Sequence, residues 1–335
     1  MPQSRSGKNT PDLTPNPSSA QTSPTIPDEP RMSRSMRLVN LLIIIVPFLG
    51  VGAAIYMLWP FGFGWASLGL LLGMYILTGL GITVGYHRLF THKSFETGPV
   101  MKTIIGIAGS MAVEGPIIGW VADHRRHHQH SDQEHDPHSP HTHGDGVWNI
   151  LRGAWHAHMG WLLARGSKTD FNRYVPDLQK DKIVVWLSKT FPLWAALGLL
   201  IPTVLGGLIT MTWTGALLGL VWGGLVRVFL VHHITWSVNS MCHIWGTKAY
   251  DCGDESRNNA ICGVLAFGEG WHNNHHAFPT SARHGLSWWQ IDMSYWVILA
   301  MEKLGLARRI KVPSAERLAS KRRAAELRPR TPGRL

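Results

Sequence analysis

Four long apolar stretches constrain the fold of this 335-residue chain more than any other feature of its sequence. A membrane-spanning helix needs about 20 mostly apolar residues, and residues 38–58 and 65–86 each supply them without a charged side chain. Residues 191–213 and 215–236 form a second such pair. Arg227 lies near the end of the fourth stretch, so we expect this helix to project beyond the bilayer. The pattern predicts an all-α integral membrane protein with four transmembrane helices.

Basic residues predict the orientation of these helices. Arg34 and Arg37 precede the first stretch, and Lys93 and Lys102 follow the second, whereas the short turns within each pair carry no charge. Basic residues concentrate on the cytoplasmic side of membrane proteins. We therefore expect both termini and every histidine-rich segment to face the cytoplasm.

The remaining segments predict a folded domain between two tails. Residues 1–36 are rich in Pro, Ser and Thr and should be disordered, and they contain no apolar segment typical of a removable signal peptide. Residues 37–310 should form the folded domain, and residues 311–335 a basic tail. Within the domain, residues 124–190 and 240–310 are expected to form a cytosolic helical cap.

Residues 100–120 are apolar but do not resemble a fifth membrane span. Gly106, Gly115 and Pro116 interrupt the segment, and Glu114 adds a charge. Irregular backbone at membrane depth is tolerated only where protein covers it. We expect an interfacial or re-entrant helix here.

Charge and cysteine content argue against two classes of protein. The formal net charge is +11, but the basic residues lie mostly at membrane flanks and near the C-terminus, without a nucleic-acid-binding motif. Three cysteines are too few for an iron–sulfur cluster with four Cys ligands. We therefore expect no nucleic-acid partner and no such cluster.

Three histidine clusters follow the predicted membrane segments. They read HRLFTH at residues 87–92, HRRHH at residues 124–128 and HNNHH at residues 272–276. Positions i, i+3 and i+4 of a helix share one face, so each HxxHH cluster can point three imidazoles at one cavity. With 19 histidines in the chain, one HxxHH motif would arise by chance only roughly 0.06 times.

One pair within this set and one outside it have a different spacing. His87 and His92 are five residues apart, which fits a helix end that bends as it leaves the membrane. Asn239 and His243, four residues apart, share a helix face. Imidazole binds iron, zinc or copper, and a single zinc site uses only four ligands. The clusters therefore predict at least two metal ions.

The other histidines are assigned no direct metal-binding role. One set lies in a loop with Pro, Asp and Gly, where we expect solvated side chains or support for the ligands: His130, His135, His138, His141 and His143. We expect the same of His156, His158, His232, His233 and His284. Arg227 is expected to extend toward the membrane interface, as charged residues near helix ends usually do.

Four segments resemble, in content and order, the histidine boxes of membrane-bound fatty-acyl desaturases, in particular the bacterial type of the delta-9, stearoyl-CoA desaturase-like group. They are GYHRLFTHKSFE, DHRRHHQHSD, WSVNSMCH and GEGWHNNHH. The resemblance covers about residues 84–287. It implies four transmembrane helices under a cytosolic cap, with a di-iron centre at their junction and a narrow acyl tunnel.

The resemblance also implies roles for individual residues. One iron would be held by His87, His92, His124, His128 and His275. The other would be held by His127, His243, His272 and His276, with Asn239 acting through a water. Trp120 and Thr235 match residues that line the tunnel. The implied reaction is O2-dependent insertion of a cis double bond, at C9, into a saturated acyl chain.

Electrons and the acyl carrier must come from outside the chain. No Gly-rich dinucleotide fingerprint is present, so we expect a ferredoxin-like or cytochrome-like donor with its reductase. Arg165, in MGWLLARG, matches a basic position of the acyl-CoA enzymes and favours acyl-CoA. Ala122 stands where the animal enzymes carry Arg, so acyl-lipid and acyl-carrier-protein substrates stay open. The expected location is the inner membrane of a bacterium.

Three other functions could use histidine-rich segments at a membrane. A membrane di-iron hydroxylase of fatty acids or alkanes would share the histidine boxes and the topology. A metal transporter is disfavoured because the predicted spans contain no carboxylate pathway across the bilayer. A haem protein with two axial histidines would show a Soret band.

Overall fold

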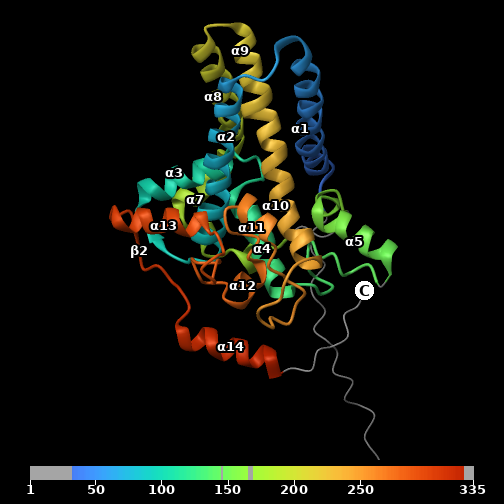
Figure 1. Cartoon of the computed structure of the whole chain (residues 1–335), viewed down its shortest axis with the longest axis vertical. Helices are drawn as coiled ribbons and strands as arrows, with labels where there is room; N and C mark the ends of the chain where they lie inside the picture. The colour runs from blue at the N-terminus through green and yellow to red at the C-terminus, as the bar shows by residue number, and fades with distance from the viewer. Residues whose placement is uncertain (1–31, 145, 165–168, 328–335) are drawn as a thin grey trace, which may run out of the picture.

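The computed structural model describes residues 32–144, 146–164 and 169–327, and these are mostly helical. Figure 1 shows long helices gathered at one end of the molecule, with shorter helices packed at the other. Four helices are long and apolar enough to cross a membrane: Arg34–Phe61, Trp65–Thr91, Phe191–Thr210 and Trp213–Ile244. The predicted helical fold with four membrane spans is confirmed. The described residues also form two short antiparallel strands, β1 (Glu96–Thr97) and β2 (Ala307–Arg308).

The first span, α1 (Arg34–Phe61), begins inside the segment predicted to be disordered. Ser33 caps it, because its side chain accepts a hydrogen bond from the backbone N–H of Met36 at 3.2 Å. The expected tail is therefore too long by three residues at this end, and the rest of it, residues 1–31, lies outside the described residues. The third span is α8 (Phe191–Thr210).

The second and fourth spans each combine α-helix with π-helix. The second consists of α2 (Trp65–Leu80) and the π-helix η1 (Gly81–Thr91). The fourth consists of α9 (Trp213–Leu218), the π-helix η4 (Gly219–Val226) and α10 (Arg227–Ile244). A π-helix forms i to i+5 hydrogen bonds and is wider than an α-helix.

This wider turn explains how His87 and His92 meet. The backbone N–H of His92 donates to the His87 carbonyl at 3.1 Å, a five-residue step. Their ring centroids lie 4.8 Å apart. The two residues were predicted to meet through a bend at the helix end, and the structure shows π-helical geometry there, which brings residues five apart to one side.

The segment at residues 100–120 is two helices rather than one. They are α3 (Pro99–Ser110) and α4 (Ile117–His130), joined by a turn in which Val113 and Gly115 have positive φ angles of 67° and 105°. α3 packs so closely on η1 that a Cβ on Gly81 would lie 2.2 Å from the Gly109 nitrogen. This turn separates α4, which carries the second histidine cluster, from α3, which packs on the membrane helices.

Arg227 does not extend toward an interface, contrary to the prediction. Its guanidinium is fully buried and donates to three backbone carbonyls: Gly223 at 3.2 Å, Met111 at 2.8 Å and Gly198 at 2.7 Å. It therefore joins α10 to α8 and to the turn after α3. His232, one helical turn further on, lies 3.0 Å from the next carbonyl of that turn, Ala112.

The remaining helices surround the ends of η1 and α10, forming a cap. They are α5 (Val147–His158), η2 (Gly160–Leu162), α6 (Phe171–Tyr174), η3 (Leu178–Lys180), α7 (Lys182–Lys189), α11 (Ala260–Leu265), α12 (His272–Ala277) and α13 (Met293–Lys303). One large apolar core, which includes Tyr86, Ile117, Leu187 and Ile298, joins η1, α4, α7 and α13. Beyond it, α14 (Ala315–Leu327) occupies part of the predicted basic tail.

Candidate metal centre

The histidine clusters reach one place from four elements. η1 carries the first, α4 the second and α12 the third, while His243 lies in the last turn of α10. All four elements meet where the membrane helices join the cap (Figure 1). The folding of the chain therefore brings together residues that are far apart in the sequence, such as His87 and His275, which are 188 positions apart.

Five imidazoles form the first group. The Nε2 atom of His275 lies 3.1 Å from that of His87 and 2.9 Å from that of His128. His128 and His124 bring their Nε2 atoms within 3.0 Å of each other. Ring nitrogens of five residues all lie within 4.8 Å of one another: His87, His92, His124, His128 and His275. A metal ion could be held among them.

Four imidazoles form a second group beside the first. The Nε2 atoms of His243 and His272 are 3.0 Å apart. The whole group, again within 4.8 Å, is His127, His243, His272 and His276. The groups touch through His128 and His276, whose ring centroids are 4.5 Å apart. The arrangement therefore offers two neighbouring metal positions, each surrounded by imidazole.

Carboxylates hold the far side of several of these rings. The Nδ1 atom of His127 lies 2.9 Å from Asp136, that of His243 2.9 Å from Asp132, and that of His276 2.7 Å from Asp254. Glu269 lies 2.6 Å from Nδ1 of His87. A carboxylate on Nδ1 fixes the ring and directs Nε2 toward a metal.

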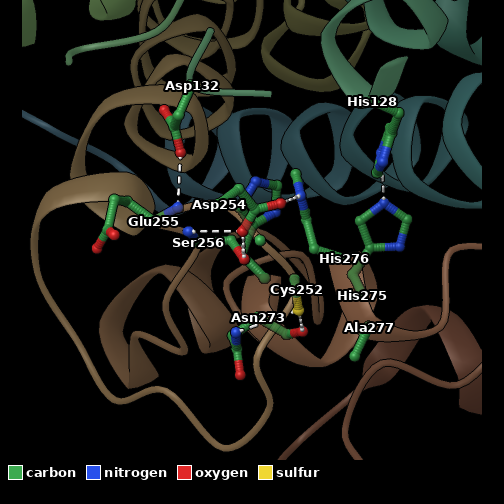
Figure 2. A network of polar contacts seen from close by, with 12 residues as sticks. His128, Asp132, Cys252, Asp254, Glu255, Ser256, Asn273, His275, His276 and Ala277 are labelled. Carbon is green, nitrogen blue, oxygen red and sulfur yellow. Dashed lines mark hydrogen bonds and ion pairs between the residues drawn. The ribbon is translucent and has the colours of Figure 1, made fainter. Parts of the chain in front are cut away.

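These acidic residues were not predicted from the sequence. Asp132 and Glu269 lie inside the quoted histidine boxes, where a carboxylate beside a histidine run could have indicated the role. Asp254 lies in the loop between α10 and α11 and carries no such signal. Figure 2 shows it between the His276 ring and Ser256, with the backbone N–H of Glu255 donating to Asp132 at 2.7 Å.

The protonation of three imidazoles in the first group suits metal binding. Burial, together with the charge that neighbouring histidines would carry, holds the pKa of His124, His128 and His275 well below its usual value. The neutral imidazole that results is the form that binds metals. The Nε2 atoms of His92 and His276 are buried and have no hydrogen-bond partner among the described residues. Unpaired acceptors in such a cluster fit a bound metal ion.

An apolar cavity begins at the first histidine group and runs between α2 and α10. Its wall includes His87 and His124 at one end and Asn239 beside the second group. Apolar side chains line most of the rest, among them Tyr75, Ile82, Val231, Ile234 and Phe267. An acyl chain that lay in this cavity would pass directly beside the imidazoles.

Glu114 links the two residues predicted to line the tunnel. Trp120 and Thr235 both belong to the cavity wall. Trp120 Nε1 donates to one Glu114 oxygen at 3.0 Å, and Thr235 Oγ1 donates to the other at 2.8 Å. Burial raises the pKa of Glu114 to about 7. The sequence alone had indicated Glu114 only as a charge that interrupts an apolar segment.

Comparison with known proteins identifies the family. The sequence model of the fatty acid desaturase family matches residues 59–310, which include every histidine of both groups. This chain belongs to the fatty acid desaturase family. The desaturase is thus an oxidoreductase by family, as the resemblance of its histidine boxes predicted.

Three similar proteins illustrate what the family contains. Hex-5-enoyl-[acyl-carrier protein] acetylenase of Moorena producens (strain JHB) is 43% identical over 286 residues, which are 85% of this desaturase and 89% of that protein. The sn-1 stearoyl-lipid 9-desaturase of Anabaena variabilis is 42% identical over 269 residues, 79% and 92% of the two chains. An acyl-CoA 5-desaturase of Anemone leveillei is 39% identical over 259 residues, 76% and 75% of the two chains.

Two of the other histidines of the desaturase take the supporting role, which was one of the two predicted alternatives. His138 and His284 are buried. The His138 ring stacks on His127 with centroids 4.4 Å apart, and Nδ1 of His284 lies 3.2 Å from Glu269. Both therefore support the two groups from outside. Arg165, predicted to bind the acyl carrier, lies outside the described residues.

Proposed function

We propose that this desaturase uses O2, two iron ions and electrons from an external donor to introduce a cis double bond at C9 of a saturated fatty acyl chain. One observation carries the proposal. Two adjacent groups of imidazoles lie at the wall of an apolar cavity that enters the membrane helices. Such a site can hold two redox metals next to an extended hydrocarbon.

The nine histidines would divide between the two ions as the geometry groups them. His87, His92, His124, His128 and His275 would hold one iron, and His127, His243, His272 and His276 the other. Asn239 lines the cavity beside His272 and would act on the second iron through a water. When bound, the iron supplies the activation of O2 that removal of hydrogen from an unactivated methylene requires.

The reaction balances with two electrons from outside. The acyl chain loses two hydrogen atoms from adjacent carbons, and the donor supplies two further electrons with two protons from water. Together these reduce O2 to two waters. The residues of the chain position the reactants: the apolar wall holds the acyl chain, and Glu114 fixes Trp120 and Thr235 where the cavity passes the histidines.

We propose a fatty acyl chain as the substrate and leave the group that carries it to the test below. Acyl-CoA was favoured by Arg165, whereas the names of the three relatives above include an acyl-carrier protein, a lipid and CoA. The cavity wall is apolar and would hold the same hydrocarbon from each. We therefore keep all three carriers as arms of the test.

The basic residues beside the spans support an orientation in the membrane, and this orientation decides from which side an electron donor can reach the cap. We propose that the cap faces the cytoplasm of a bacterial inner membrane, because Arg34, Lys93 and Lys102 flank the spans on the cap side. A ferredoxin-like or cytochrome-like protein, reduced by its own reductase, would then reach the cap from the cytoplasm.

Product analysis tests the proposed function. Iron-loaded full-length protein in lipid nanodiscs would be incubated with O2, NADPH, ferredoxin and ferredoxin reductase. Parallel reactions would contain stearoyl-CoA, stearoyl-lipid or stearoyl-[acyl-carrier protein]. Gas chromatography with mass spectrometry should find a cis double bond at C9 in at least one arm, and none without O2. Hydroxylated product alone, or a double bond elsewhere, would contradict the proposal.

A further inference from the structure

Helix α14 covers the end of the helix that carries the third histidine cluster. Leu318 packs against a small buried cluster that contains Tyr250, Ala277 and Phe278. Lys321 Nζ donates to the Ala277 carbonyl at 2.6 Å, and Ala277 directly follows a histidine of the second group. α14 begins at Ala315, beyond the segment that the family model matches. It therefore lies outside the matched segment and covers the second histidine group from the outside.

The exposed face of α14 carries two arginines that flank its packed side, and it lies far from the membrane spans. Arg317 and Arg322 are exposed, and neither has an ion-pair partner among the residues that the structure describes. Residues 308–335 contain ten basic and two acidic residues. Figure 1 places α14 at the opposite end of the molecule from the turn between α8 and α9. Anionic lipids around the spans are therefore poorly placed to neutralise this charge.

Only a thin layer of protein separates this face from the second histidine group. The Arg322 guanidinium lies 5.9 Å from the Tyr250 ring centroid. The backbone N–H of Tyr250 donates to Asn273 Oδ1 at 2.8 Å, and Asn273 follows His272 in the chain. Figure 2 shows Asn273 and Ala277 around the same turn as His276. A redox protein that rests on α14 would bring its cofactor close to the metal positions.

We infer that the basic face of α14 is the docking surface for an acidic one-electron carrier protein. The inference rests on the proposed function, which requires electrons from outside the chain. Complementary charge steers the encounter of two proteins and makes their association depend on ionic strength. The contact of α14 with the end of α12 places this surface next to the helix that carries His272 and His276.

Charge reversal tests the docking surface directly. The probe is a recombinant acidic [2Fe–2S] ferredoxin, and the sample is the full-length desaturase in nanodiscs. We expect Arg317→Glu/Arg322→Glu to raise the Kd for ferredoxin, measured by biolayer interferometry, by about tenfold or more at low salt. Arg317→Lys/Arg322→Lys should retain the affinity, because long-range steering needs the charge rather than the guanidinium. Lys182→Glu/Lys189→Glu on α7 makes the same change in net charge elsewhere and should leave the Kd unaltered.

Turnover separates this inference from the proposed function. The rate of double-bond formation with ferredoxin should fall about tenfold in Arg317→Glu/Arg322→Glu. A single turnover, started by adding O2 to protein that was reduced with dithionite and freed of the excess, should be unchanged. Equal Kd values for the α14 and α7 variants would overturn the docking surface even if the protein desaturates normally. A protein that binds ferredoxin through α14 but forms no unsaturated product would instead overturn the proposed function.

Discussion

Asp254 supports a histidine that lies 22 residues away in the sequence. Its Oδ2 atom is 2.7 Å from Nδ1 of His276, and its Oδ1 accepts a hydrogen bond from the backbone N–H of Ser256 at 3.0 Å. We predict that Asp254→Asn lowers the affinity of the second group for metal by about 10–100-fold. Metal content after dialysis against a graded series of chelator concentrations measures this change.

Glu255→Gln is the matched control for that substitution. Glu255 is the next residue in the same loop, but its carboxylate is half-exposed and pairs with Lys248 and Arg257 instead of a histidine. Surface ion pairs contribute little, so the metal content of this variant should equal that of the wild type. Equal losses in both variants would mean that the loop, not the Asp254 carboxylate, matters.

Glu114 should make stability depend on pH. Burial raises its pKa from 4.5 to about 7, so below pH 4.5 the carboxyl is neutral in both folded and unfolded chains. Above pH 7 the folded protein must hold a buried charge that the unfolded chain exposes to water. Its contribution to stability is therefore lost as pH rises between these values, by on the order of 3 kcal/mol.

Glu114→Gln removes this ionisation and tests it. The Tm of the variant minus that of the wild type should become more positive between pH 5 and pH 8. Any hydrogen bond that the amide loses at Trp120 or Thr235 shifts the difference equally at every pH. A difference that stays constant with pH would show that Glu114 does not titrate in this range.

Single residues were predictable from the sequence where a local pattern carries them. HxxHH spacing places three imidazoles on one helix face, and both HxxHH clusters lie in helices, α4 and α12. Asp254 could not be found in this way, because its contact with His276 depends on the path of a loop. Glu114 was noticed only as an unfavourable charge, because its partner Thr235 comes from α10, 121 positions away.

At the scale of elements, Arg227 joins three helical segments. Its guanidinium donates to the carbonyls of Gly198 in α8 and Met111 after α3. We predict that Arg227→Met destabilises the protein by about 2–5 kcal/mol, because it leaves these buried carbonyls without a donor. Thermal unfolding in detergent measures the loss. Arg152→Met on the exposed side of α5 should change the Tm little. A similar loss of Tm in both variants would argue against a stabilising role for the hydrogen bonds of Arg227.

The bounds of the helices show which parts of the fold could be predicted from sequence patterns alone. Hydropathy is a local property, so three of the four spans lie within five residues of their predicted bounds. The fourth helix continues eight residues past the predicted end at residue 236. The π-helix η1 is not visible in hydropathy, because it changes hydrogen bonding without changing which residues are apolar. The division of α3 from α4 depends on the carbonyls that Arg227 and His232 hold from α10, which is a tertiary contact.

At the scale of the whole molecule, two neighbouring metal positions lie between the membrane helices and the cap. The first group takes its histidines from η1, α4 and α12, and the second from α4, α10 and α12. Correct placement of one group therefore requires correct placement of the other. The sequence indicated that at least two metals are present, but only the folded chain shows the groups in contact through His128 and His276.

The number of irons in active protein tests this account most directly. Plasma mass spectrometry of protein purified with iron would be plotted against the rate of double-bond formation in the same samples. The account predicts that activity rises with iron content up to two irons per chain, and that His243→Ala retains about one iron and no activity. Full desaturation with a single iron per chain, or with none, would contradict it.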